Sequence, residues 1–310
     1  MTNSFTFVDL FAGIGGIRLA FESTGGKCVF TSEWDKYAQI TYQENFGDVP
    51  NGDITQIDEK EVPNHDVLLA GFPCQPFSHA GLRKGFDDIR GTLFFDIVRI
   101  LSTKKPKLVL LENVKGFATH DKGNTYSVVC RTLESLGYEV HSQVLNAREF
   151  GIPQNRERIY IVGIDRTRTL KATFNFPNPP MTNVKVGDIL ESKVDEKYTI
   201  SDKLWAGHQR RLREHRARGN GFGYSLFNSA SRYTSTISAR YYKDGSEILI
   251  SQKGKNPRKL TPREAARLQG FPDGFKIPVS DAQAYRQFGN SVAVPVVSAI
   301  ATEMIKLLKK

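Results

Sequence analysis

Cysteine is scarce in this chain, and the cysteines that are present stand far apart. The 310 residues include only Cys28, Cys74 and Cys130. An odd number of widely separated thiols suits neither a disulfide framework nor a paired CxxC metal site, so we expect no metal ion. Each thiol is interpreted from its own surroundings, and a buried, inert thiol is the expectation for Cys28 and Cys130.

Long apolar runs are missing too. No uncharged apolar stretch approaches the roughly 20 residues that a membrane-spanning helix needs. The opening residues, MTNSFTFVDLFAG, contain Asp9 and lack both a basic leader and a small-residue cleavage site, which sets them apart from a signal peptide. We therefore expect a cytoplasmic protein with no membrane partner.

Acidic residues are too few to balance the basic ones. Lys and Arg number 43 against 33 Asp and Glu, which gives a formal net charge of +10. This excess favours a polyanionic partner through phosphate contacts, although charge alone leaves membranes and ribosomes open as partners. With 39% hydrophobic residues, the chain is long enough for one large domain and a smaller appended module.

The first half of the chain alternates apolar runs with helical patterns. Helices are predicted from about Ile17, around Lys36 to Phe46 and near Gly123 to Leu136. Nearly continuous apolar runs are typical of buried parallel strands, so the alternation predicts βαβ units over about the first 165 residues. The predicted strands are FTFVDLF, KCVFTSE, HDVLLAGFP, PKLVLLENV, YEVHSQVLNA and ERIYIVGI.

Composition changes after the segment FNFPNPPMTN, whose prolines indicate a boundary. From about residue 185 to about residue 260, the chain is richer in Gly, Ser, Tyr and Arg and shows no parallel-sheet pattern. Beyond this region, LTPREAARLQGFP predicts a helix with Thr261 as N-cap, Pro262 at its first position and Gly270 at its end. The segment VPVVSAIATEMIKLLKK predicts a last helix.

A glycine-rich turn follows the first predicted strand. In FVDLFAGIGGIRLAFE, Gly13, Gly15 and Gly16 stand between strand and helix, where a ligand can approach the backbone. The turn differs from GxGxxG and has no Walker-type lysine, so nicotinamide binding and phosphate transfer fit less well. Taken alone, these glycines are equally compatible with an ordinary tight turn.

Two acids strengthen the interpretation of the turn as a ligand site. Glu33 is predicted to end the second strand and Asp53, in NGDI, to end the third, where carboxylates can bind a ribose and an adenine amino group. Trp34 could stack on the adenine ring. A packed core aromatic is nevertheless the simpler interpretation of a single tryptophan.

Candidates for chemistry also follow apolar strands. Cys74, in GFPCQPFS, and Glu112, in LLENV, should both emerge at the carboxyl edge of the sheet, where α/β proteins bind ligands. A carboxyl group beside an apolar strand tends to have a raised pKa and can then donate to a ring nitrogen, the alternative being an ion pair with a lysine such as Lys115. Arg156 and Arg158, in QNRERIY, alternate along an extended segment and so share a side. They suit a carbonyl oxygen and a phosphate, unless they are solvated salt-bridge partners.

These segments together resemble the cytosine-5 DNA methyltransferase family of bacterial restriction-modification systems, almost from end to end. The family's usual order is kept, with its variable region between the seventh and eighth segments: FVDLFAGIGG, SEWD, NGDI, GFPCQPFS, RGTLFFD, LLENV, QNRERIYIVG, TPREAARLQGFPD and FGNSVAVPVV. The resemblance implies an α/β fold, with a Rossmann-like domain that binds S-adenosylmethionine on a mixed, mostly parallel sheet, and a smaller target-recognition domain. The implied divisions are a catalytic and cofactor-binding domain at 1–180, a target-recognition domain at 181–260, a connecting helix at 261–289 and a C-terminal helix at 290–310 that returns to the first domain.

The resemblance also implies a mechanism. Cys74 would attack carbon 6 of a cytosine flipped out of duplex DNA, while Glu112 engages ring nitrogen 3. Arg156 and Arg158 would help to hold the base and the loop. Carbon 5 would then receive the methyl group of S-adenosylmethionine, and loss of its proton with elimination of the thiolate would leave 5-methylcytosine and S-adenosylhomocysteine.

Binding residues are assigned by the same resemblance. Gln75 to Gly91 would form a mobile loop that closes over DNA. The cofactor pocket would be lined by Phe11, Ala12, Gly13, Gly15, Gly16, Glu33, Trp34, Asp53, Ile54, Pro73, Leu93, Asn290 and Ser291. The double-stranded DNA would be contacted by Gln75, Ser78, Arg90, Arg232, Arg240 and Tyr241.

The variable region is the candidate for gripping and reading DNA. Arginines of the run QRRLREHRAR could meet phosphates, although about half of its charges are expected on a solvated face. Arg232 and Arg240 could reach guanine in the major groove. The strings RGNGFGYSLF and TISARYYKDGSEILI resemble target regions of Dcm-type and related enzymes, which implies a CCGG or CCNGG-like target.

Two other functions stay open. One is methylation of RNA cytosine by the same architecture, against which the full-length basic module argues. The other is a DNA-binding protein without activity, against which the intact Cys74, Glu112 and Arg156 argue. We expect a monomer, because modifying one base per binding event needs no two-fold symmetry, and a cognate restriction endonuclease would act on the same site without a stable complex.

Overall fold

The computed structural model describes residues 4–73, 92–169, 173–180, 182–221 and 223–308. The chain packs as two compact units. Unit 1 comprises Met1–Asn146, Glu157–Asn178 and Val296–Lys310, and unit 2 comprises Ala147–Arg156 and Pro179–Pro295. Residues 147–156 and 261–295 thus pack in the same unit as the predicted target-recognition region. The functional division of the chain stays a prediction.

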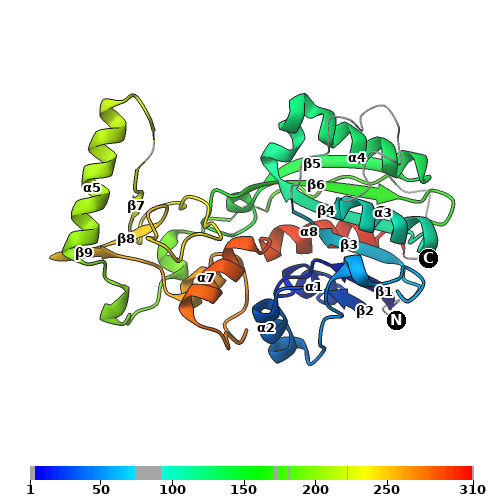
Figure 1. The fold of residues 1–310 in the computed structure, drawn as a ribbon, viewed down its shortest axis with the longest axis horizontal. Helices are drawn as coiled ribbons and strands as arrows, with labels where there is room; N and C mark the ends of the chain where they lie inside the picture. The colour runs from blue at the N-terminus through cyan, green and yellow to red at the C-terminus, as the bar shows by residue number, and fades with distance from the viewer. Residues whose placement is uncertain (1–3, 74–91, 170–172, 181, 222, 309–310) are drawn as a thin grey trace. The chain divides into compact units, whose positions relative to one another are not determined.

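A six-stranded sheet forms the centre of unit 1 (Figure 1). Its strand order is β2-β1-β3-β4-β6-β5; the first four strands are parallel, and β6 is antiparallel to both neighbours. The strands are β1 (Phe5–Leu10), β2 (Gly26–Ser32), β3 (Val67–Gly71), β4 (Leu108–Val114), β5 (Glu139–Asn146) and β6 (Glu157–Ile164). The prediction of a mixed, mostly parallel sheet over about the first 165 residues is confirmed.

Helices cover both faces of this sheet, which explains the continuous apolar runs of its strands. On one face, α3 (Leu93–Lys104) and α4 (Asn124–Ser135) share a core with alternate residues of β1, β3, β4 and β6. On the other face, Phe21 of α1 (Gly16–Glu22) packs against Phe5 and Phe7. Strands without a solvent-facing side need apolar residues at successive positions, as β3 and β4 have.

Helix α2 (Lys36–Phe46) has the predicted bounds, and its ends are fixed by local chemistry. The Asp35 side chain caps its start by accepting from the backbone N–H groups of Tyr37 and Ala38. Gly47, in the left-handed region at φ 76°, ends it. The strand predicted to end at Asp53 is wrong, because NGDI forms only one bridge, Glu33 with Gly52, before a short 3-10 helix, η1.

Unit 2 contains little regular structure. Its sheet has three short strands, β7 (Leu226–Phe227), β8 (Leu249–Gln252) and β9 (Lys255–Arg258), of which β7 and β8 are parallel. Its helices are α5 (Asp202–Ala217), α6 (Pro262–Arg267) and α7 (Asp281–Asn290). As predicted, α6 has Thr261 as N-cap and Pro262 at its first position, and Thr261 and Glu264 also form a capping box.

Short 3-10 helices connect the larger elements in both units. They are η1 (Ile54–Gln56), η3 (Lys115–Gly123), η4 (Ala147–Glu149), η5 (Val186–Ile189) and η6 (Glu196–Tyr198).

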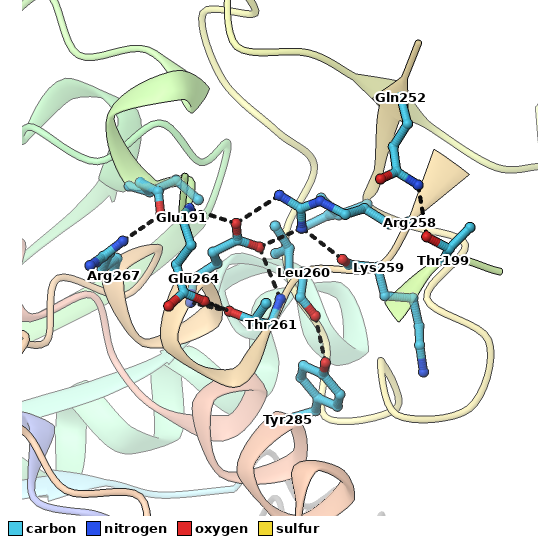
Figure 2. A network of polar contacts seen from close by, with 12 residues as sticks. Glu191, Thr199, Gln252, Arg258, Lys259, Leu260, Thr261, Glu264, Arg267 and Tyr285 are labelled. Atoms are coloured by element: carbon cyan, nitrogen blue, oxygen red, sulfur yellow. Dashed lines mark hydrogen bonds and ion pairs between the residues drawn. The ribbon is translucent and has the colours of Figure 1, made fainter. Parts of the chain in front are cut away.

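A buried network of hydrogen bonds and an ion pair stabilises unit 2, whose strands are short (Figure 2). Arg258 donates to both carboxylate oxygens of Glu264, at 2.7 and 2.8 Å. The same carboxylate accepts from the backbone N–H groups of Thr261, at 2.9 Å, and Glu191, at 2.8 Å. Glu264 is fully buried, so these four donors replace the water that its charge has lost.

The C-terminal stretch is strongly apolar. Asp281–Ile305 has the length and composition of a membrane span, with a mean hydropathy of 1.4 in its most apolar window. It consists of α7 and α8 (Val294–Ile305), and 61% of that window is buried inside the protein. Burial of this kind is typical of core helices, so the apolar character is explained without a membrane.

Candidate active site

The strand that precedes Cys74 ends beside Glu112. Gly71, the last residue of β3, is the sheet partner of Glu112 on β4. The Asn113 side chain donates to the Phe72 carbonyl at 2.9 Å, which ties the next residue down as well. The chain thus leaves the sheet at the exposed Pro73. The predicted site residues that come next, Cys74, Gln75, Ser78 and Arg90, lie outside the described residues.

Glu112 is paired with Arg158. Arg158 Nε lies 3.2 Å from Glu112 Oε1, and the two side chains are only 15% and 12% exposed. The alternative partner, Lys115, binds Glu157 at 3.0 Å instead. Strand β6 runs antiparallel to β4, so its amino end brings Arg158 to the edge where β4 ends. The raised pKa expected for Glu112 stays a prediction.

Arg156 has different partners from Arg158, although the two are separated by one residue. Its guanidinium, buried in unit 2, donates to the backbone carbonyls of Ile237, Gly289 and Ser291 at 3.2, 3.1 and 2.6 Å. The two arginines therefore make separate contacts, and their joint role in the site stays a prediction. Arg156 precedes β6 and holds the backbone of unit 2.

Gln154 makes a similar connection that the sequence did not predict. Its amide accepts from the Ile237 backbone N–H at 3.0 Å and donates to the Leu268 carbonyl at 2.7 Å. Gln269 in turn donates to the Phe288 carbonyl at 2.6 Å. The sequence segments QNRERIY, RLQGFP and FGNSV are thus joined by side-chain to backbone bonds. The signal was present in the sequence, since all three are motif segments and two of them contain a buried side-chain amide, Gln154 and Gln269.

The glycine-rich turn after β1 is tight on one side and open on the other. Phe11 and Gly13 both have φ 56° and Gly15 has φ 83°, so three residues adopt the left-handed region. A Cβ on Gly15 would collide with the ring of Phe46, which packs against the turn. A Cβ on Gly13 would meet nothing within 4 Å, so a ligand has room to approach the backbone there.

Glu33 and Trp34 lie beside this turn. Glu33 accepts from the backbone N–H groups of Gly13 and Asp35, each at 2.8 Å, and burial raises the pKa of its carboxyl. The carboxylate therefore connects the glycine turn to the end of β2. Trp34 is 77% exposed, which excludes the packed core aromatic that a single tryptophan would suggest. An exposed indole next to an open backbone turn fits the stacking of a planar ring.

The prediction that Asp53 ends a strand is wrong, but Asp53 directly follows a residue that forms a β-bridge with Glu33. It caps the 3-10 helix Ile54–Gln56 by accepting from the Thr55 N–H at 3.0 Å. The bridge between Glu33 and Gly52 brings the preceding residue next to the end of β2. Ile54 is buried, so Asp53 is the exposed polar residue of the pair.

The remaining cofactor candidates are divided between the two units. Leu93 is half-buried at the first position of α3 in unit 1. In unit 2, Asn290 is the last residue of α7 and is exposed, and Ser291 is its C-cap. Ala12 is buried, and Gly16 begins α1.

Of the predicted DNA-reading residues in unit 2, two are exposed and one is not. Arg232 and Arg240 are exposed. Tyr241 as a DNA contact is wrong: it is fully buried, and its hydroxyl donates to the Ile248 carbonyl at 2.7 Å and accepts from the Leu260 N–H at 2.8 Å. A phenol with both hydrogen-bonding directions occupied in the core cannot reach a base.

The cysteines outside the predicted site, Cys28 and Cys130, are half-buried rather than buried. Burial raises the pKa of Cys28 to about 12 and also raises the pKa of Cys130, so both thiols resist ionisation. Among the residues that the structure describes, no three His, Cys, Asp or Glu side chains gather into a potential metal site.

Sequence comparison agrees with this geometry. The profile described as C-5 cytosine-specific DNA methylase matches residues 5–306. Type II methyltransferase M1.ScrFI of Lactococcus lactis subsp. cremoris is 63% identical over 311 residues, which cover 100% of this chain and 80% of that protein. Type II methyltransferase M.NlaX of Neisseria lactamica is 65% identical, covering 97% of this chain and 96% of its own.

The chain belongs to the C-5 cytosine-specific DNA methylase family.

Solved structures agree on the fold. The Dnmt2 methyltransferase of S. pombe superposes with a TM-score of 0.80 at 20% identity, covering 99% of this chain and 100% of that one. At that identity the likeness concerns the fold alone. The α/β architecture with a mostly parallel sheet is therefore that of the methyltransferases.

Membership makes the protein a DNA cytosine-5 methyltransferase that uses S-adenosylmethionine. The described residues fit this cofactor. The open backbone at Gly13 and the exposed ring of Trp34 stand at adjoining strand ends of unit 1. An adenine and a ribose need this combination of a flat apolar surface and nearby hydrogen-bonding groups.

Proposed function

We propose that the protein methylates carbon 5 of a cytosine in a short GC-rich duplex, CCGG or CCNGG-like, through a covalent bond to Cys74. The observation that carries this proposal is the pairing of Gly71 with Glu112 and of Phe72 with Asn113. These contacts hold the strand end that leads to Cys74 beside the Glu112–Arg158 pair.

The proposed roles follow from the chemistry of cytosine. Carbon 5 is a poor nucleophile until a group adds to carbon 6, and a thiolate is suited to that addition. Cys74 sulfur forms a bond to carbon 6, and Glu112 engages nitrogen 3, where negative charge would otherwise develop. Arg158, 3.2 Å from Glu112, orients its carboxyl group. After carbon 5 is methylated, it loses its proton and the carbon 6–sulfur bond breaks, which restores the thiolate.

Cofactor binding is assigned to the edge of the sheet in unit 1. S-adenosylmethionine supplies an electrophilic methyl group when it is bound. We infer that Glu33 and Asp53 bind its ribose and adenine amino group and that Trp34 stacks on the ring. In unit 1, the other proposed cofactor-binding residues are Phe11, Ala12, Gly13, Gly15, Gly16, Ile54, Pro73 and Leu93. Asn290 and Ser291 are proposed cofactor-binding residues of unit 2.

The biological setting is also a proposal. Relatives with 62 to 65% identity are named Type II methyltransferases, which supports a role in restriction and modification. The target rests on the likeness of RGNGFGYSLF and TISARYYKDGSEILI to Dcm-type target regions. We further propose that the protein acts as a cytoplasmic monomer on double-stranded DNA and that unit 2 contains the target-recognition region.

The decisive experiment is transfer of labelled methyl groups from S-adenosylmethionine to duplexes containing CCGG, CCWGG, CCSGG, GCGC or GGCC, with a transfer RNA control. We expect label in one duplex. Label only in RNA would assign the other substrate class, and DNA binding without label would favour a protein that has no activity.

Replacing the thiol tests the mechanism. Cys74→Ala should abolish transfer because no other group can add to carbon 6, while binding of DNA and S-adenosylhomocysteine is kept. Cys130→Ala is the matched control: its thiol is held protonated by burial, so transfer should stay at the wild-type rate. Transfer by the Cys74→Ala protein would overturn the covalent mechanism.

A further inference from the structure

Helix α5 of unit 2 is strongly basic in its C-terminal half. Its sequence, DKLWAGHQRRLREHRA, contains five Lys and Arg residues and two acids, and Arg218 follows as its C-cap. Ser201 caps its start by accepting from the Leu204 N–H. At about 1.5 Å per residue, such a helix is long enough to run beside several phosphates of a duplex.

One side of α5 is packed within unit 2. Trp205 and His208 contact the ring of Tyr224, with centroids 4.7 and 6.3 Å away. Gly223 lies so close to Leu212 that a Cβ there would collide with its side chain. His208 is buried, and burial lowers the pKa of its imidazole, so the ring is neutral at physiological pH.

Arg211 serves this packed side. Its guanidinium donates to Asp244 at 2.9 Å and to His208 Nδ1 at 2.7 Å. Asp244 also accepts from the Ser246 N–H at 3.1 Å, so the ion pair anchors α5 to the segment that follows Arg240. Arg210 is likewise paired, with Glu214 at 3.6 Å.

Three other arginines are not engaged in this way. Arg213, Arg216 and Arg218 are exposed, and none of their side chains makes a hydrogen bond or ion pair with any residue in the described parts of the chain. Arg213 and Arg216 are three residues apart and share one face of the helix. Three unpaired cations grouped at one end of a helix repel each other, so a polyanion bound there would be stabilised twice, by attraction and by relief of repulsion.

We propose that Arg213, Arg216 and Arg218 form a phosphate-binding surface that grips the backbone of duplex DNA without reading its sequence, whereas Arg211 is a positioning residue for α5. The proposal rests on the proposed function, because it names how the DNA substrate is held. It divides the arginines of one helix into two groups that should respond differently to substitution.

The experiment measures DNA affinity against salt concentration for the full-length protein. The variant R213Q/R216Q/R218Q should reduce the slope of log K against log salt by about 2 to 3, since each phosphate contact contributes about 0.9. Affinity at moderate salt should fall on the order of 10- to 100-fold, equally for target and non-target duplexes, because phosphates carry no sequence information.

A matched control separates a surface from overall charge. K107Q/R166Q/K306Q removes the same charge from cations paired with Asp66, Glu139 and Glu303 in unit 1. Its salt slope should equal that of the wild type. A second variant, R213K/R216K/R218K, keeps the charges and should keep the slope, which controls for damage to the helix.

The outcomes are distinct. An unchanged slope in the Gln variant, or an equal fall in the control, would overturn the proposal. A loss confined to the target duplex would overturn it as well, because α5 would then read bases. If the wild type methylates DNA in each of these cases, the proposed function stands. If the wild type transfers no label to any duplex, the proposed function fails, whatever the slopes are.

Discussion

The two units satisfy their buried backbone in different ways. In unit 1, six strands pair their peptide groups with one another, so a buried side chain need only be apolar and of suitable size. In unit 2, the strands have two to four residues, and buried side chains such as Gln154 and Arg156 bind the peptide groups instead. A ladder tolerates many apolar sequences. A side chain that replaces a ladder must keep its own hydrogen-bonding groups, so conservative changes should cost far more in unit 2.

The largest expected effect is on the Arg258–Glu264 pair. Glu264→Gln changes one oxygen into an amide nitrogen but leaves the buried Arg258 without a counter-charge, which should reduce the free energy of unfolding by about 3–5 kcal/mol. Chemical unfolding measures it. Glu196→Gln is the matched control, because Glu196 is the exposed partner of Lys255 and should contribute less than about 1 kcal/mol.

The double variant R258M/E264L sharpens the same test. Removing both charges leaves no uncompensated ion, but the N–H groups of Thr261 and Glu191 lose their acceptor, so only part of the lost stability should return. If Glu264→Gln were no worse than Glu196→Gln, polar side chains would not be what holds unit 2 together.

This difference also explains what the sequence could and could not predict. The strands and helices of unit 1 follow from runs such as LVLLENV, because ladder packing requires a repeating pattern of apolar residues. Antiparallel β6 was among the predicted strands, but no pattern gives its direction. Asp53 was misplaced because its signal, an acid after a glycine, fits a strand end and a helix cap equally well.

In unit 2, the sequence predicted the motif segments better than it predicted which residues they contact. QNRERIY was recognised as a motif, but the partners of Arg156 lie 81 to 135 residues away along the chain. The family resemblance implies a DNA contact for Tyr241, yet only a structure shows which side of a turn is buried. Motif residues here mark long-range polar contacts, which no local periodicity encodes.

Unit 1 contains a buried carboxyl group of its own, at Asp9 on β1. Burial outweighs the attraction of Arg18 and raises the pKa of this carboxyl to about 8. The unfolded chain, with the ordinary value of 3.8, binds fewer protons between about pH 4 and 8, so stability should fall as pH rises through this window. Between pH 5 and 8 the loss should reach up to about 4 kcal/mol.

Asp9→Asn removes this titration. Its unfolding free energy should depend less on pH than that of the wild type, with the two proteins differing most near pH 8. Thermal or chemical unfolding at several pH values measures the difference in slope. Parallel curves would mean that Asp9 is charged in the folded protein. Asp9 would then not make the stability of unit 1 depend on pH.

The smallest expected effect is in the ladder-held core of unit 1. Ile161, on β6, is 1% exposed, and Ile161→Val removes one methyl group while every backbone pair is kept. The cost should be about 1 kcal/mol. Glu264→Gln removes no heavy atom at all, so on packing alone it should be the milder change. If unfolding shows the opposite order, hydrogen bonding rather than volume limits unit 2. If Ile161→Val costs as much as Glu264→Gln, volume limits both units, and the distinction between them fails.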